Sequence, residues 1–513
     1  MKKTPLPCLL AVLCAASASA ASFTWDGSEF ATSTNWTTAA NWVGGAAPDN
    51  DGTATLLFNQ SPTPGSFAST VGVAYNINKL TITSQSTPFT YSGSPITFSG
   101  SGAAITVTTA SGNSTSTANT IANNIVLNAA LTINRGVSST NAARINISGI
   151  ISGAHAITTG FDNGILRLTG DNTFTGGVSN VRGNLEIGHN SALGTGALSL
   201  SGTSAASVSL TGGAKSIANG LNIAGVASGT GATTFSGDLT VGGAVTLNGT
   251  AGVNTKYTTI ASAAKLTLNG DIGESGTLGK NFRVNGSSTG STGTLVLNGN
   301  ATYTGSTQLG SIETTSRTVF INGDFSSSSA TSVNAGMTLR GVGTVAAVTV
   351  GANAILAPGG DVDDTVTPTL GTLDVDGGVT FNSGSTFKLN LAAAGASDAI
   401  SLTGGTVDIN ATGVTLALNI TGGYGTLSGS TYTLASFDTI VGSYGSFTSI
   451  TLNGSASDIT ALNAAGYNLV YGTDSIYLQS TSIPEPATIS LMIGLGALGL
   501  VASRRRGNAG RRS

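Results

Sequence analysis

Apolar residues alternate with small polar residues along most of the chain, and the alternation is clearest between Gly164 and Leu200. In a β-strand, a period of two places successive side chains on opposite faces. The apolar positions come in pairs, each soon followed by a Gly or Asn that favours a turn: Leu166 with Leu168, Leu185 with Ile187, and Leu198 with Leu200. The stretch predicts three or four short strands. Because so small a unit cannot bury its own apolar face, it also predicts neighbours stacked on it.

The same pattern recurs on both sides of this stretch. Upstream, short alternating strands are predicted around Ile77 with Leu80 and Ile82, Ile105 with Val107, Ile125 with Leu127, and Leu131 with Ile133. Downstream, Gly293–Gly305 is a near-copy of the stretch. The matched residues share one spacing: Leu295, Leu297, Tyr303 and Gly305 correspond to Leu166, Leu168, Phe174 and Gly176.

Composition supports thin, regular β structure. The 513 residues include 73 Gly, and only 8% of residues are charged. A disordered chain would be strongly charged or poor in branched apolar residues, whereas Val, Ile and Leu recur here almost from end to end. We therefore predict an all-β fold of stacked short strands, with no large globular core.

The two copies resemble the autotransporter-associated β-strand repeat, and the segment at Ala357-Pro358-Gly359 resembles the end of an autotransporter-type passenger. The resemblance implies a parallel β-helix, or β-solenoid, in which successive turns stack as parallel strands. It assigns residues 70–369 to a solenoid with these repeats and residues 370–480 to its passenger-like C-terminal part.

The first twenty residues are typical of a secretory signal peptide. Lys2 and Lys3 precede an apolar run, and Ala18-Ser19-Ala20 forms an A-x-A cleavage site. Both cysteines, Cys8 and Cys14, lie in this segment, so cleavage would leave a mature chain without disulfides.

All three tryptophans, Trp25, Trp36 and Trp42, lie between residues 21 and 69. One interpretation is an N-terminal cap that seals the end of the solenoid core and blocks edge pairing. The alternative is an aromatic platform on which sugar rings stack, making this region a small glycan-binding module. Terminal units of repeat arrays are usually atypical, which favours the cap.

The C-terminal segment, 481–513, combines three features in a fixed order. It has a short polar motif, an apolar run of 16 residues at 487–502 and an arginine cluster; the motif and cluster residues are Pro484, Glu485, Pro486, Arg504, Arg505 and Arg506. As a helix the run spans about 24 Å, slightly short of the roughly 30 Å hydrocarbon core. A permanent transmembrane anchor is one interpretation, with the arginines on the cytoplasmic side.

This order resembles the PEP-CTERM sorting signal of exopolysaccharide-producing Gram-negative bacteria. The resemblance implies transient membrane insertion through the C-terminal hydrophobic helix and recognition by a transpeptidase-like exosortase. It further implies removal of the helix and delivery to the cell surface or extracellular matrix.

Charge excludes one class of partner. The whole chain carries a net charge of −3, but seven basic residues lie in the two terminal segments. The body from Ala21 to Pro486 has 13 basic residues against 23 acidic ones, a net charge of −10. Nucleic acid is not expected as a partner, because phosphate binding needs clustered Lys and Arg.

Asp361, Asp363 and Asp364 form the one dense acidic cluster. We interpret it as a solvated loop between turns, with a weak calcium site as the alternative. No metal centre, other cofactor or catalytic residue is predicted. Gly494–Gly499 matches G-x-G-x-x-G without the preceding strand that a dinucleotide site needs. Four polar residues of the Gly164–Leu200 stretch are expected on side faces and turns, not in a site: Arg167, Asp171, Glu186 and His189.

These observations predict a non-enzymatic, exported β-helix protein of the cell surface or matrix, with an adhesive or structural role. Rows of Thr, Asn and Ser suit many weak contacts to exopolysaccharide or other glycans. The first alternative is a polysaccharide lyase or hydrolase on the same fold, which needs two or three carboxylates brought together from different turns. The second is the glycan-binding module at the Trp region.

Overall fold

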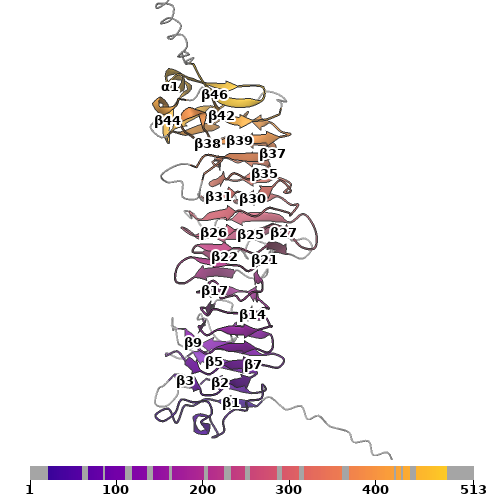
Figure 1. Cartoon of the computed structure of the whole chain (residues 1–513), viewed down its shortest axis with the longest axis vertical. Coiled ribbons are helices and arrows are strands. Elements are labelled where there is room, and N and C mark those ends of the chain that lie inside the picture. Colours follow the sequence, from indigo (N-terminus) through magenta and orange to yellow (C-terminus); the bar gives the residue numbers. More distant parts are fainter. Residues whose placement is uncertain are drawn as a thin grey trace, which may run out of the picture. The chain divides into compact units, whose positions relative to one another are not determined.

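The structure is a computed structural model, and it describes residues 21–59, 67–84, 87–109, 118–135, 143–160, 164–200, 206–224, 233–248, 255–285, 292–310, 317–360, 369–420, 423–428, 431–438 and 446–481. The predicted signal peptide and the hydrophobic helix predicted at 487–502 lie outside these residues. Within them the chain is a nearly all-β parallel β-solenoid, and its only α-helix is the short α1 (Ile459–Ala464) (Figure 1). The predicted fold class is confirmed.

The chain divides into two compact units. The first consists of residues 1–339 and 343–346, and the second of residues 340–342 and 347–513. The domain boundaries predicted from the sequence stay predictions.

Each turn of the first unit passes through three sides, and strands of successive turns pair in parallel on each side. The first sheet has 11 strands: β1 (Ser22–Thr24), β2 (Thr55–Phe58), β5 (Lys79–Ser84), β8 (Ala104–Thr109), β11 (Leu131–Arg135), β14 (Ile157–Gly160), β16 (Val178–Val181), β18 (Leu198–Leu200), β21 (Leu221–Ala224), β24 (Val245–Asn248) and β27 (Ile272–Glu274).

The second sheet follows the first around each turn. Its strands are β3 (Ala68–Val71), β6 (Thr90–Gly93), β9 (Asn119–Ile121), β12 (Arg144–Ile147), β15 (Ile165–Leu168), β17 (Gly183–Ile187), β19 (Ala206–Leu210), β22 (Thr233–Ser236), β25 (Thr255–Ile260), β28 (Asn281–Asn285), β30 (Thr307–Leu309), β32 (Asp324–Phe325) and β33 (Thr331–Val333). The short strand β32 pairs with the start of β35 (Thr344–Val350).

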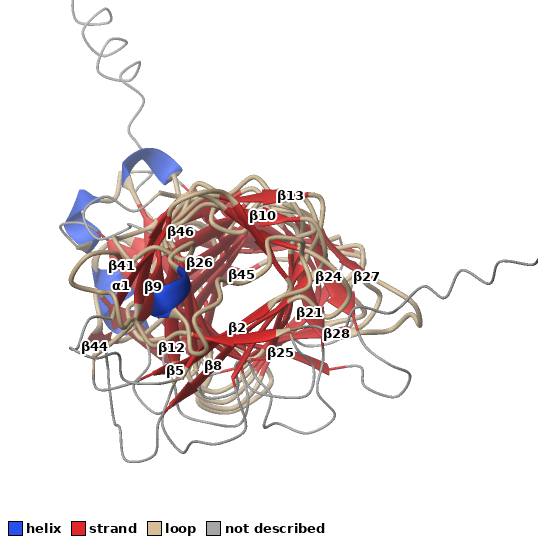
Figure 2. Cartoon of the chain, turned by 90° about the horizontal axis from the view of Figure 1, so that it is seen from below, coloured by secondary structure: helices blue, strands red, loops and turns tan. Residues whose placement is uncertain are grey.

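The third side carries two separate sheets. They consist of β4 (Tyr75–Ile77), β7 (Ile96–Phe98), β10 (Ile125–Leu127) and β13 (Ile151–Gly153), and then of β20 (Lys215–Ile217), β23 (Leu239–Val241), β26 (Lys265–Leu268), β29 (Thr294–Leu297), β31 (Arg317–Ile321) and β34 (Met337–Arg340). Between the two sheets, the buried side chains of Phe174 and Leu193 fill this side. In Figure 2, β10 and β13 lie across the interior from β2 and β8.

Apolar side chains stack in columns inside the first unit. Leu56, Leu80, Ile105 and Ile133 are partners in register on four successive strands, and all four are fully buried. The alternation read from the sequence therefore places Leu, Ile and Val inward and Thr, Ser and Asn outward.

One corner of the first unit is built from Asn-Gly pairs in three successive turns. The Asn298 amide donates to Asn269 Oδ1 (2.8 Å), and the Asn322 amide donates to Asn298 Oδ1 (2.9 Å). Glycine follows each asparagine, and a Cβ on Gly299 would collide with the carbonyl oxygen of Gly270 in the preceding turn. The close stacking of backbones explains why this corner needs glycine.

The two sequence copies occupy different sides of the solenoid. Leu166 and Leu168 belong to β15 in the second sheet, whereas Leu295 and Leu297 belong to β29 on the third side. All four leucines nevertheless point inward and are buried. The repeated motif therefore corresponds to one strand and the corner after it, and it can occupy more than one side of the solenoid. It does not correspond to one complete turn.

The second unit contains two groups of paired strands and ends in antiparallel strands. One sheet contains β36 (Ile355–Leu356), β38 (Thr386–Leu391), β41 (Thr415–Ile420), β43 (Ser449–Leu452) and β44 (Ser455–Ser457); the other contains β37 (Thr372–Phe381), β39 (Ala399–Thr403), β40 (Val407–Asp408), β42 (Thr431–Ser436), β45 (Tyr467–Tyr471) and β46 (Ser475–Ser480). The pairs β43–β44, β42–β46 and β45–β46 are antiparallel. Short 3₁₀ segments complete the described elements: η1 (Ala39–Asn41), η2 (Ala393–Gly395) and η3 (Tyr424–Thr426).

Candidate functional site

The three tryptophans lie inside an aromatic cluster at the start of the first unit. Trp25, Trp36 and Trp42 are at most 1% exposed. The ring of Phe58 packs against all three, with centroid distances of 5.5 to 5.9 Å. Tyr91 also lies in this cluster, 4.9 Å from Phe58 and edge-on to it.

Hydrogen bonds fix the indoles in place. Trp42 Nε1 donates to the Trp36 carbonyl oxygen (2.8 Å), and Trp36 Nε1 donates to Ser69 Oγ (3.2 Å). The Val43 N–H donates to the Thr24 carbonyl (2.8 Å), so this segment covers the outer edge of β1. As the structure places them, the indoles present no face to a sugar ring. Their burial fits the cap interpretation.

The polar residues of the Gly164–Leu200 stretch pair with each other on the outside of the first unit. Arg167 Nε and Glu186 Oε2 lie 2.5 Å apart, on residues that are partners in register between β15 and β17. His189 Nδ1 lies 3.6 Å from Asp171 Oδ1 at a turn. The pairing fits the expectation that these residues occupy side faces and turns.

The predicted acidic cluster at Asp361, Asp363 and Asp364 lies outside the described residues. Within the part of the chain that the structure describes, no three His, Cys, Asp or Glu side chains gather in a way that could hold a metal ion.

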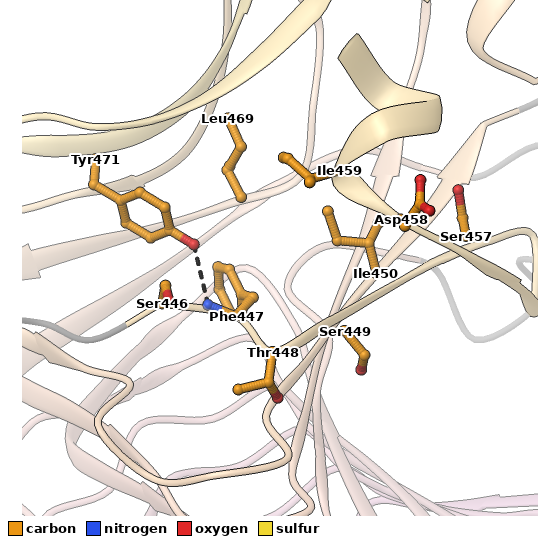
Figure 3. A pocket seen from close by; sticks show the side chains of 10 residues that line it. All are labelled: Ser446, Phe447, Thr448, Ser449, Ile450, Ser457, Asp458, Ile459, Leu469 and Tyr471. Atoms are coloured by element: carbon orange, nitrogen blue, oxygen red, sulfur yellow. Dashed lines mark hydrogen bonds between the residues drawn. The ribbon is translucent and has the colours of Figure 1, made fainter. Parts of the chain in front are cut away.

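A cleft opens in the second unit between β43, β45 and the start of α1 (Figure 3). Its volume is about 440 Å³, which falls in the range of small-molecule sites. Phe447, Ile450, Ile459, Leu469 and Tyr471 supply its apolar lining. The Ile459 side chain stands at the start of α1 and is 44% exposed.

Aromatic rings stack behind one wall of the cleft. Phe447 packs on Tyr471, with centroids 6.3 Å apart, and on Phe387, with centroids 6.2 Å apart and planes at 21°. The Phe447 N–H donates to Tyr471 Oη (3.1 Å), and burial raises the pKa of the Tyr471 phenol. The phenol therefore stays protonated near neutral pH and keeps its own proton to donate.

Polar side chains line the rest of the cleft. Thr448 Oγ1 donates to the Val414 carbonyl (3.1 Å), which leaves the lone pairs of the hydroxyl oxygen to accept. One oxygen of Asp458 accepts the Ala461 N–H (2.7 Å) and caps α1. The second carboxylate oxygen of this exposed side chain can accept a further hydrogen bond. Ser446, Ser449 and Ser457 add three more hydroxyls.

The cleft was not predicted from the sequence. Its residues come from a strand, a helix start and an antiparallel hairpin, and no motif links them. The only signal was the enrichment in Tyr and Phe between Tyr424 and Leu478.

A second, shallower groove crosses the sheet face of the same unit. Asp374 and Ser401 are partners in register on β37 and β39, and Ser436 on β42 continues the row. These three residues and Thr372 line the groove, whose volume is about 550 Å³. This surface offers hydroxyls and a carboxylate.

Charge is distributed unevenly along the body. Residues 21–340 contain 12 acidic and 12 basic residues, whereas residues 341–481 contain 10 acidic residues and a single basic one, Lys388. The cleft and the groove thus belong to the acidic part of the chain. A net negative charge favours the approach of cations and disfavours that of anions.

One carboxylate of the second unit is buried. Asp398 is fully buried; Oδ1 accepts the Gly371 N–H (3.0 Å), and Oδ2 accepts the Asn390 backbone N–H (2.9 Å) and side-chain amide (2.8 Å). Burial raises the pKa of Asp398 to about 6, although these hydrogen bonds and the charge of Arg340 act against the rise. Through these hydrogen bonds the Asp398 carboxylate links the residue directly before β39 to β38. Its role is structural.

Comparison with known protein families matches residues 482–506, directly after β46. The matched family is the PEP-CTERM protein-sorting motif. The tail of this chain carries that motif. Pro484, Glu485, Pro486, Arg504, Arg505 and Arg506 all fall within the PEP-CTERM match. The sorting signal predicted from the sequence is confirmed.

The PEP-CTERM motif implies exosortase-dependent export, and it indicates sorting to the cell surface or the extracellular space of Gram-negative bacteria. Its recognition by exosortase agrees with the first predicted partner. Among the helices formed by the described residues, none has the length and apolar character to span a membrane. A comparison with curated proteins finds no match.

Proposed function

We propose that the protein is a non-enzymatic adhesive or structural component of the cell surface or extracellular matrix. The observation that carries the proposal is the PEP-CTERM match at residues 482–506, at the end of a parallel β-solenoid. In this proposal the hydrophobic segment 487–502 inserts transiently into the membrane, exosortase removes it, and the solenoid is delivered outside.

The outward faces of the solenoid support an adhesive role. Thr132, Thr158 and Ser179 follow one another in register along the first sheet, and Ser199 and Asn222 form a like pair on its later strands. These short polar side chains offer repeated hydrogen-bonding positions to a glycan chain. We also propose that the two sequence copies are autotransporter-associated repeats. Gly176 and Gly305 occupy matched positions in them, and a Cβ on either would collide with the backbone of the preceding turn.

No observation on the described residues favours the lyase or hydrolase alternative. Incubation of the purified protein with a panel of acidic polysaccharides tests it directly. We expect no new reducing or unsaturated ends, and their appearance would overturn the non-enzymatic proposal. The N-terminal glycan-binding module is not adopted, because Trp25, Trp36 and Trp42 are buried.

Cell fractionation tests the sorting step. A variant combining Pro484→Ala, Glu485→Ala and Pro486→Ala should stay in the membrane fraction, while the wild-type protein reaches the surface. Arg511→Gln combined with Arg512→Gln is the matched control, because both residues lie beyond the matched motif. Equal surface delivery of the Pro-Glu-Pro variant would contradict the proposal.

A further inference from the structure

We propose that the cleft between β43, β45 and α1 binds a neutral sugar residue of a surface glycan. The inference rests on the proposed function for its setting, since export brings the second unit into contact with glycans. It goes further by naming the site and the class of sugar.

The apolar lining suits the carbon face of a sugar ring. Tyr471, the last residue of β45, packs its ring on Phe447, and the hydrogen bond from the Phe447 N–H fixes its position. Leu469 and Ile459 point into the same space from the strand and the helix start (Figure 3). A rigid aromatic ring with a polar tip offers contact area at a low cost in conformational entropy.

The polar lining suits the hydroxyl groups around that ring. The second oxygen of Asp458 and the hydroxyl oxygen of Thr448 can accept, and the Tyr471 hydroxyl can donate. A cleft that combines apolar walls with a few polar groups is the usual form of a small-molecule site. An apolar ligand would leave the second oxygen of Asp458, the hydroxyl lone pairs of Thr448 and the hydroxyl proton of Tyr471 unused by the ligand, which is unfavourable.

Charge selects the class of sugar. Asp458 lies at the cleft, and residues 341–481 carry a net charge of −9. A uronic acid or a sulfated sugar would bring a second negative charge next to this carboxylate, and like charges in contact are unfavourable. The cleft therefore fits a neutral sugar and disfavours the acidic polysaccharides.

Titration calorimetry on the full-length protein tests the inference. The probes are neutral hexamers of glucose, galactose and mannose, with hexagalacturonate as an anionic probe of the same length. We expect saturable binding of at least one neutral hexamer, with little dependence on salt, and no binding of the hexagalacturonate. Binding of hexagalacturonate alone, or of no probe, would overturn the inference.

Two variants locate the site. Tyr471→Ala should weaken binding about tenfold, the equivalent of roughly 1.4 kcal/mol. Because Tyr471 also packs on Phe447, Ile459→Ser serves as a second variant, since its side chain is 44% exposed and its removal does not open the core. We expect about a threefold loss from Ile459→Ser, as for a contact at the edge of a site. The matched control is Val342→Ser, at a 49% exposed side chain outside the cleft.

Unchanged affinity in both cleft variants would show that the sugar binds elsewhere and would overturn the inference. Surface delivery is measured separately by the fractionation assay. A delivered protein that fails to bind neutral sugars would therefore contradict the cleft assignment and leave the proposed sorting intact.

Discussion

Trp25 and Trp42 pack edge to face, with ring centroids 5.1 Å apart and planes at 84°, and their backbones form an antiparallel bridge. The pair lies at the first strand of the first sheet, where the column of stacked side chains begins. Large aromatic side chains supply there the apolar contacts that a preceding turn would otherwise provide. We therefore expect the tryptophans to stabilise this end of the solenoid.

Replacing Trp36 tests this role. The indole is fully buried and donates to Ser69, so Trp36→Ala should lower the free energy of unfolding of the N-terminal turns by about 3–5 kcal/mol. Hydrogen exchange of the first turns measures the effect, with Val43→Ala at a 54% exposed neighbour as the control. Loss of glycan retention with unchanged exchange would instead support the sugar-stacking alternative.

The Asn-Gly corner predicts a steric effect at Gly299. An alanine there would push its Cβ into the Gly270 carbonyl, a backbone atom that cannot rotate away. Gly299→Ala should therefore destabilise the first unit by about 1–3 kcal/mol. Gly160→Ala is the matched control, because its Cβ would lie 3.4 Å from Asn134, an ordinary contact. Equal melting temperatures for the two variants would contradict the description of this corner.

Asp398 predicts a pH dependence of the second unit. Burial raises its pKa from 3.8 to about 6 in the folded chain, so the protonated form is favoured on folding. Its contribution to stability is therefore fully present below pH 3.8 and is lost as the pH rises through about 6. The free energy of unfolding of the wild-type protein should fall relative to that of Asp398→Asn between about pH 4 and pH 7.

Subtracting the two curves cancels the titration of the other acids. Asp398→Asn should also be less stable at low pH, because an amide replaces one of the oxygens that accept from Gly371 and Asn390. A constant difference between the two proteins across the pH range would contradict the raised pKa.

The fold could be predicted from the sequence because its repeating element is local. The period of two at Leu166 and Leu168 determines which face is buried, and Leu185 and Ile187 lie in register with that pair. The number of residues in one turn, by contrast, is not determined by a local sequence pattern. Partners in register are separated by 19 residues at Arg167 and Glu186 but by 29 at Leu266 and Leu295.

The corners between strands vary in length, and this variation explains why the sequence alone did not assign each strand to a side of the solenoid. A side can be assigned only when the corners before it are counted, so the shift of the second copy to the third side could not be foreseen. The cleft was also missed, because Ile450, Ile459 and Tyr471 meet through an antiparallel closure with no repeat to mark it. The sorting tail was predictable, because its motif, apolar run and arginines are contiguous.

Mass spectrometry of the protein recovered from the cell surface tests the central claim most directly. The exosortase account predicts a mature chain that ends near Pro484-Glu485-Pro486 and yields no peptide from Ala487–Ser513. In a host without exosortase, the same peptides should be present and the protein should remain in the membrane fraction. An intact Ala487–Ser513 segment on the surface-delivered protein would contradict the account.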